Sequence, residues 1–317
     1  MREAEINGEK VCIKGLRTYA QGNDDTIKKV RPSVIRHWGA PLKRLDRQKF
    51  YEEVVVWKRL QHPNIVPCLG VPTGRWPPFE IVCSWMENGK ITDYVGKYPD
   101  VDRINLVSVF ASTVTVSFRK LYLQLWDVVD GLHFLHSCKI IHGDLKGVSL
   151  ISLLQLSGSR SLISMDSKAN ILVDGNGRAR LTDFGLTSIT RGDNSINSPQ
   201  ETSPASTTWA APEVLESGNV TKEGDIFTVA MVSVEVRASR ISASASQVHY
   251  LEQIFTGHSP FIKNYNSALY DIMSGKRPQR PGTLDHDKLW RFVQRCWDQD
   301  PSRRPTTSEL LEFFRTS

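Results

Sequence analysis

The feature that most constrains the fold is a change in hydrophobic periodicity along the 317-residue chain. Near the start, Asn7-Gly8 is the residue pair typical of a two-residue hairpin turn, and residues 65–71 and 79–85 are short apolar runs separated by Gly and Pro. From Leu125 onward, apolar residues recur at helical spacing instead. This order predicts an α+β protein of two lobes, a small β-rich one followed by a larger helical one.

Four further segments have clear secondary-structure predictions. A helix is expected over residues 50–60, before His62-Pro63. Residues 169–183 are expected to form a second hairpin around Asp174-Gly175-Asn176-Gly177. Two more segments have one apolar helical face each. The apolar positions are Leu125, Val128, Val129, Leu132 and Leu135 in the first, and Leu289, Phe292, Val293, Cys296 and Trp297 in the second.

Composition excludes several classes of protein. A content of 40% apolar and 23% charged residues is ordinary for a globular chain, and a net charge of +6 is too small to indicate nucleic-acid binding. No apolar run is long enough to cross a bilayer, and the first residues lack the apolar core of a signal peptide, so neither membrane association nor secretion is expected. The five widely spaced cysteines indicate a reducing compartment, by default the cytoplasm or the nucleus, with the thiols in the core.

A series of polar motifs follows the order that phosphoryl transfer requires. That reaction needs a cation on the nucleotide phosphates, carboxylates for Mg²⁺ and an acceptor for the substrate hydroxyl proton. Lys14 ends a strand, and Glu53 on the following helix could hold it by an ion pair. Residues 142–146, His-Gly-Asp-Leu-Lys, supply the carboxylate of Asp144 and a lysine two residues later. Residues 183–185, Asp-Phe-Gly, supply a metal-binding carboxylate after the second hairpin.

Each of these motifs also has an ordinary structural explanation. Taken alone, Lys14 is a solvated charge at a strand end, Glu53 is a surface residue of an amphipathic helix, and Asp-Phe-Gly is a turn. The order and the spacing of the motifs, rather than any single residue, favour the phosphoryl-transfer hypothesis.

The motifs resemble those of eukaryotic protein kinases over most of the chain. The nearest resemblance is to the tyrosine-kinase-like group of Ser/Thr kinases found in mushroom-type fungi, in which HGDLKGxN replaces the commoner HRDLKxxN. It implies a two-lobed kinase fold that uses ATP and Mg²⁺ to phosphorylate Ser or Thr of a protein substrate in signal transduction. Asp144 would orient the hydroxyl group and Lys146 would stabilise the transferred phosphoryl group, while Asn170 and Asp183 would hold Mg²⁺.

The resemblance also assigns residues around the nucleotide and in the helical lobe. Lys14, held by Glu53, would position the α- and β-phosphates. Cys83 and Met86 would contact adenine as gatekeeper and hinge residues. In the helical lobe, Asp225 would support the catalytic loop, and Arg304 would pair with Glu213 of Ala211-Pro212-Glu213.

The chain departs from the kinase pattern in two ways. The Gly-rich loop that would precede residue 7 is missing, so we expect an N-terminally truncated domain, with a small lobe of about residues 1–86 and a larger lobe of about 87–317. In addition, Asn170 follows Asp144 by 26 residues rather than five. Removing four segments of 18–21 residues restores normal spacing or helix continuity. They are residues 30–48, 107–124, 148–168 and 236–253.

Each of the four segments begins with Val and ends with Gln or Lys. Val codons begin with GT, and the final residues can be encoded by codons that end in AG, so the segments have the ends of introns translated in frame. Genuine loop insertions are the alternative. At the level of function, the alternatives to an active kinase are an impaired pseudokinase or scaffold that binds nucleotide, and a retained-intron product that does not fold as written.

Overall fold

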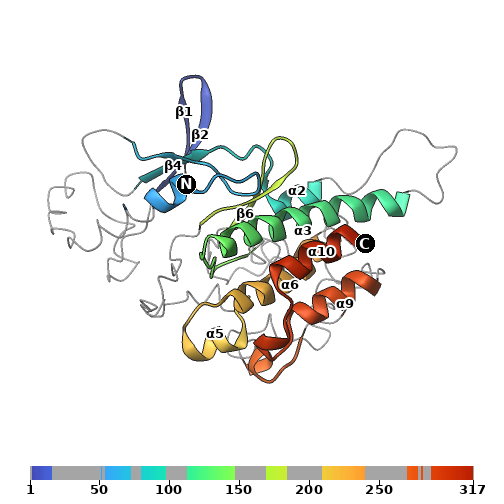
Figure 1. Ribbon diagram of the computed structural model, residues 1–317. Coiled ribbons are helices and arrows are strands. Elements are labelled where there is room, and N and C mark those ends of the chain that lie inside the picture. Colours follow the sequence, from blue (N-terminus) through green and yellow to red (C-terminus); the bar gives the residue numbers. More distant parts are fainter. Residues whose placement is uncertain are drawn as a thin grey trace, which may run out of the picture. The chain divides into compact units, whose positions relative to one another are not determined.

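The computed structural model describes residues 2–15, 51, 54–72, 80–97, 113–146, 169–183, 209–239, 270–277, 280 and 287–316. Two compact units are present (Figure 1). The first comprises residues 1–61 and 66–85, and the second comprises residues 62–65 and 86–317. The division after residue 85 lies one residue before the expected lobe boundary, and residues 62–65 join the second unit instead of the first.

The first unit contains a four-stranded antiparallel sheet in the order β1-β2-β4-β3. The predicted first hairpin is confirmed, because Asn7 and Gly8 connect β1 and β2 with φ angles of 54° and 81°. Positive φ at both turn residues matches the right-handed twist of the two strands. The strands are β1 (Arg2–Ile6), β2 (Glu9–Gly15), β3 (Cys68–Gly70) and β4 (Glu80–Ser84).

The predicted helix of the first unit is present over residues 54–59, and Tyr51 is also helical. Two side-chain bonds connect it to the chain around β3. The buried indole Nε1 of Trp57 donates to the carbonyl of Val66 at 2.8 Å, and Lys58 Nζ donates to the carbonyl of Leu69 at 2.9 Å. These bonds satisfy backbone carbonyls in and beside an edge strand, which fixes the helix against the sheet.

The second unit contains a three-stranded antiparallel sheet in the order β5-β6-β7. The predicted second hairpin is confirmed, with Asp174 at its turn. The Asp174 carboxylate accepts hydrogen bonds from the backbone N–H groups of Asn176 and Arg178, both at 3.0 Å. An aspartate that binds its own turn in this way fixes the turn locally. The strands are β5 (Gly89–Lys90), β6 (Ile171–Val173) and β7 (Ala179–Leu181).

The other regular elements in the described part of the second unit are helices (Figure 1). The long helix α3 (Thr113–Ser137) contacts α6 (Lys222–Ser239), α10 (Thr307–Thr316) and β7. All ten apolar positions predicted for the two amphipathic helices are buried. None of the helices in the described parts of the chain is long and apolar enough to span a bilayer. The remaining helices within the described ranges are α2 (Ile91–Lys97), α5 (Pro212–Ser217), α9 (Asp287–Cys296) and the 3₁₀ turn Pro301–Arg303.

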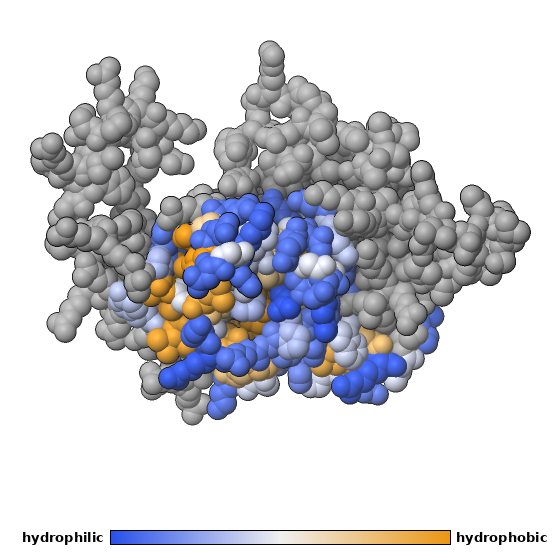
Figure 2. All heavy atoms as spheres, turned by 90° about the horizontal axis from the view of Figure 1, so that it is seen from above, coloured by the Kyte–Doolittle hydropathy of each residue, from blue (hydrophilic) through white to orange (hydrophobic). Residues whose placement is uncertain are grey.

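Large apolar side chains are exposed at a few of the described positions. Figure 2 shows an apolar area, in orange, beside hydrophilic surface. Five of the six exposed large apolar residues belong to the first unit. The six are Ile6, Tyr51, Val55, Leu69, Val71 and Tyr270.

Candidate active site

One buried carboxylate, that of Asp225 in α6, binds the backbone of the loop of residues 141–146. Its two oxygens accept hydrogen bonds from the backbone N–H of His142 at 2.9 Å and from that of Gly143 at 2.8 Å. His136 at the end of α3 lies 2.8 Å from the same carboxylate. Asp225 is only 2% exposed, and hydrogen bonds to a carboxylate are stronger than neutral ones. Asp225 therefore fixes the backbone immediately before Asp144, as expected.

Gly143 is required by the shape of this loop. Its φ angle is 72°, in the left-handed region where only glycine is free of strain. A Cβ atom at this position would lie 2.8 Å from Cγ1 of Val220, which is too close for a real contact. Both the backbone conformation and the packing therefore favour glycine between His142 and Asp144.

His142 connects the loop to the strand that leads to Asp183. Its Nδ1 accepts a hydrogen bond from the Asp144 N–H at 3.3 Å, so the ring proton lies on Nε2, which donates to the Thr182 carbonyl at 3.1 Å. Burial lowers the pKa of His142 below its ordinary value, more than the nearby Asp225 carboxylate raises it. The ring is therefore held as one neutral tautomer that links the two segments.

The three predicted catalytic residues Asp144, Lys146 and Asn170 lie together. Lys146 Nζ contacts both oxygens of the Asp144 carboxylate, at 3.1 and 2.9 Å. Asn170 Nδ2 donates to the same carboxylate at 2.9 Å and also to the Asp144 carbonyl. The Asn170 backbone N–H donates to the Lys146 carbonyl at 3.0 Å. The 26-residue separation between Asp144 and Asn170 therefore does not prevent their contact.

Asn170 and Asp183 have the chemistry of a Mg²⁺ site. The Asn170 amide nitrogen is directed at Asp144, so its amide oxygen is available as a ligand. The N–H of Thr182 donates to the Asn170 carbonyl at 3.0 Å, which puts the next residue, Asp183, beside Asn170. Asp183 has a φ angle of 65°, an uncommon left-handed conformation for a residue other than glycine. Amide and carboxylate oxygens are ligands that suit Mg²⁺, so the donor set fits.

The residues expected at the nucleotide are distributed over both units. Lys14 in β2 is buried, and its Nζ lies 5.5 Å from the ring centroid of Trp57. Cys83 in β4 is buried in the first unit, and Met86 is buried in the second. Glu53 lies outside the described residues, and the predicted Lys14–Glu53 ion pair therefore stays a prediction.

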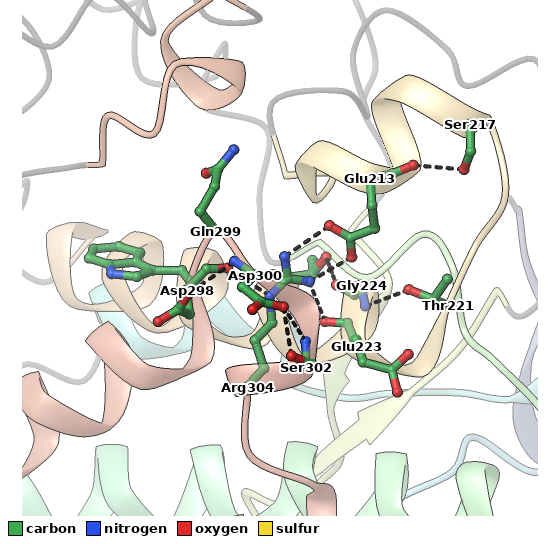
Figure 3. Close-up of polar contacts among 12 residues, drawn as sticks. Glu213, Ser217, Thr221, Glu223, Gly224, Asp298, Gln299, Asp300, Ser302 and Arg304 are labelled. Atoms are coloured by element: carbon green, nitrogen blue, oxygen red, sulfur yellow. Dashed lines mark hydrogen bonds and ion pairs between the residues drawn. The ribbon is translucent and has the colours of Figure 1, made fainter.

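Arg304 forms a further buried polar centre of the second unit (Figure 3). Its guanidinium makes two parallel hydrogen bonds to Glu213, at 2.6 and 2.8 Å, which confirms the predicted pair. It also donates to the carbonyls of Asp298 and Glu223, both at 2.9 Å, and lies 5.1 Å from the Phe227 ring centroid. This arrangement connects α5, α6 and the 3₁₀ turn through one side chain.

Sequence reasoning missed two residues of this architecture. His136 lies on the buried face of α3, among apolar residues. A polar residue at such a position needs a buried partner, and this signal could have identified His136 as a partner of Asp225. The Arg277 guanidinium also contacts the Phe227 ring, at 4.9 Å from the ring centroid, so two arginines lie against this ring. Burial, and to a smaller extent repulsion from Arg304, lowers the pKa of Arg277 to about 10. No local pattern in the sequence predicts this second cation.

The loop and the adjoining Asn170 and Asp183 together form the arrangement expected of a phosphotransferase. Comparison with known families agrees. Residues 17–150 match the protein tyrosine and serine/threonine kinase family, and residues 159–313 match the protein kinase domain.

Curated relatives point in the same direction. Serine/threonine-protein kinase STY17 of Arabidopsis thaliana is 27% identical over 84% of this chain, and a probable serine/threonine-protein kinase of Dictyostelium discoideum is 26% identical over 95% of it. Tyrosine-protein kinase SPK-1 of Girardia tigrina is 25% identical over 98%. The aligned residues are 37%, 18% and 54% of these relatives, so the chain spans less than two thirds of their length. Together the matches show that the chain is similar to eukaryotic protein kinases over most of its length.

Proposed function

We propose that the chain is a protein kinase that transfers the γ-phosphoryl group of ATP to Ser or Thr hydroxyls of protein substrates. We further propose that it belongs to the tyrosine-kinase-like Ser/Thr group found in mushroom-type fungi, since His-Gly-Asp-Leu-Lys-Gly begins at residue 142. The observation that carries the proposal is the contact of Asp144 with both Lys146 and Asn170, at 2.9 Å in each case. The serine/threonine kinase names of the relatives support the acceptor class.

In this proposal each residue of the cluster has one task. The Asp144 carboxylate accepts or orients the proton of the substrate hydroxyl, and Lys146, held at that carboxylate, balances the negative charge of the transferred group. The oxygens of Asn170 and Asp183 would hold Mg²⁺, which neutralises phosphate charge when bound. Lys14 would bind the α- and β-phosphates.

The nucleotide base and the phosphate-binding lysine have their own proposed contacts. Cys83 and Met86 would contact adenine, and Glu53 would hold Lys14 by an ion pair. Lys14 and Cys83 are both buried in the same sheet, in β2 and its neighbour β4, which supports a common role.

A phosphate-transfer assay with phosphoamino-acid analysis tests this function. The full chain, γ-labelled ATP and casein are incubated with Mg²⁺ or with EDTA. Labelled phosphoserine or phosphothreonine that requires Mg²⁺ is expected. Label on tyrosine would overturn the acceptor class. Stabilisation of the chain against heat by Mg·ATP without any transfer would instead identify a nucleotide-binding scaffold.

We also propose that residues 107–124 and the other three insertions are absent from the working protein. Gln124, the last residue of the second insertion, lies in α3 and is 1% exposed. Neither polar atom of its amide has a hydrogen-bond partner among the described residues, which costs about 1–3 kcal/mol for a buried polar group. Without the insertion, Leu106 would precede Leu125 and would bring an apolar side chain to this position.

Sequencing the spliced transcript across residues 25–260 tests this domain organisation. Transcripts that lack all four segments are expected, and they would encode Asn170 five residues after Asp144. Transcripts that retain the segments would overturn the proposal and would leave four genuine insertions.

A further inference from the structure

Three reduced cysteines form one row across the sheet of the first unit. Cys12 in β2 is the register partner of Cys83 in β4, and Cys68 in β3 is the partner of the same Cys83. Directly opposed residues of antiparallel strands project on the same face of a sheet. We propose that this cysteine row is a redox-active site, in which a peroxide oxidant produces a reversible disulfide bond at Cys83.

The hydrogen-bond pattern of the sheet distinguishes the two pairs. The N–H of Ser84 donates to the carbonyl of Pro67 at 3.1 Å, so Ser84 and Pro67 form a hydrogen-bonded pair. The next pair, Cys68 and Cys83, is therefore a non-hydrogen-bonded pair, in which side chains approach most closely and Cα atoms are about 4.5 Å apart. A disulfide requires Cα atoms about 4.4–6.8 Å apart.

Cys83 directs its own N–H and carbonyl groups away from β3, because alternate residues of a central strand bond to opposite neighbours. Cys12 and Cys83 are therefore a hydrogen-bonded pair, with Cα atoms about 5.5 Å apart, which also lies in the range for a disulfide. At the spacings typical of an antiparallel sheet, Cys83 can thus bond to a thiol on either side. The register irregularity of β3 lies between Cys68 and Gly70, beyond the Cys68–Cys83 pair.

Accessibility suggests the order of reaction. Cys68 and Cys83 are buried, whereas Cys12 is half-buried and is the most accessible thiol of the row. Lys14 lies two residues further along β2, so its side chain projects on the same face as Cys12. The thiolate is the form of a cysteine that reacts with peroxides, and the more accessible thiol of a row meets the oxidant first.

The chemistry is balanced with hydrogen peroxide as the oxidant. The Cys12 thiolate attacks one peroxide oxygen, the O–O bond breaks, and the leaving hydroxide takes a proton to become water, which leaves a sulfenic acid. The Cys83 thiol then attacks the Cys12 sulfur, the S–O bond breaks, and a second water leaves as the disulfide forms. Attack of the Cys68 thiolate on Cys83 transfers the disulfide to the Cys68–Cys83 pair and releases Cys12 as a thiol.

The two cysteines outside the cysteine row, Cys138 and Cys296, differ in accessibility. The expectation that all five cysteines lie in the core is wrong for Cys138, which is exposed, and only partly met by Cys12, which is half-buried, whereas Cys296 is buried. Burial raises the pKa of the Cys296 thiol well above its ordinary value, so this residue is an unreactive internal reference.

Disulfide mapping tests the cysteine row. The full chain with Cys138→Ser, which prevents cross-links between molecules, is treated with hydrogen peroxide, blocked with N-ethylmaleimide and digested without reduction. Peptides that join Cys83 to Cys12 or to Cys68 are expected, and dithiothreitol should remove them. Cys296 should remain a free thiol. A Cys83 that stays alkylatable, or that is oxidised only to sulfinic or sulfonic acid, would overturn the proposal.

Two variants, each checked for an unchanged melting temperature, sharpen the test. Cys83→Ala should abolish both disulfides, whereas Cys12→Ser should slow formation of the Cys68–Cys83 disulfide at least several-fold. A full rate in Cys12→Ser would contradict the entry role of Cys12. If Cys83 contacts adenine, which rests on the proposed function, oxidation should also weaken ATP binding reversibly. A mapped disulfide in a chain that never binds ATP would overturn the proposed function alone.

Discussion

Replacing Asp144 by Asn is expected to reduce phosphate transfer by about 10²–10⁴-fold, the usual contribution of a general base. The amide has the size of the carboxylate and can still accept a hydrogen bond from Lys146 or Asn170, both of which contact Asp144. It cannot accept the proton of a substrate hydroxyl. The rate at saturating Mg·ATP measures the effect, and the ATP affinity should change little because Asp144 is not assigned to the nucleotide.

Asp93→Asn is the matched control for this variant. Asp93 is exposed in the first turn of α2, so the same chemical change is made away from the catalytic loop. Its activity should equal that of the unmodified chain. Full activity in Asp144→Asn would contradict the assigned role. An equal loss in both variants would show that a change of charge, rather than the position of Asp144, determines the rate.

Replacing Arg304 by Met is expected to lower the free energy of unfolding by about 3–5 kcal/mol, because it leaves the Glu213 carboxylate without its cation. The Arg304 side chain is fully buried, at 0% exposure, and Glu213 is 22% exposed. The variant also removes the donors to the carbonyls of Asp298 and Glu223. Urea unfolding followed by circular dichroism measures the change.

Arg303→Met provides the control within the same segment. The Arg303 side chain is 74% exposed and lies 3.5 Å from Asp300, so its removal should change the stability by no more than about 0.5 kcal/mol. The double variant Arg304→Met with Glu213→Gln should be more stable than the sum of the single changes predicts, because no unpaired charge remains. Strict additivity would contradict a direct interaction between Arg304 and Glu213.

Local patterns predicted much of this fold because local physics determines those parts. The turn at Asn7-Gly8 requires positive φ at both residues, and Asn and Gly tolerate it best. The predicted start of the long helix near Leu125 was later than the observed start at Thr113. The added residues begin Thr-Val-Thr-Val-Ser, and β-branched residues and Ser have weak helix propensity.

The candidate site was predictable where a known motif order identified its residues, as for Asp144 and Asn170. Contacts between distant segments were not predictable in the same way. The third partner of Asp225, His136, is 89 positions away, and the pairing of Cys12 with Cys83 depends on strand register. A short turn fixes the register of a hairpin, but β2 and β4 are far apart in the sequence and have no such turn between them.

The hydrogen bond between the Asn170 N–H and the Lys146 carbonyl joins two residues that are 24 positions apart in the sequence. For a flexible loop, each doubling of length adds only about 0.6 kcal/mol of closure entropy. Both ends are held by contacts of their own, Lys146 to Asp144 and Asn170 to Asp144 and Thr182. Removal of residues 148–168, which shortens this connection, is therefore expected to preserve the contact of Asp144 with Asn170 at little thermodynamic cost.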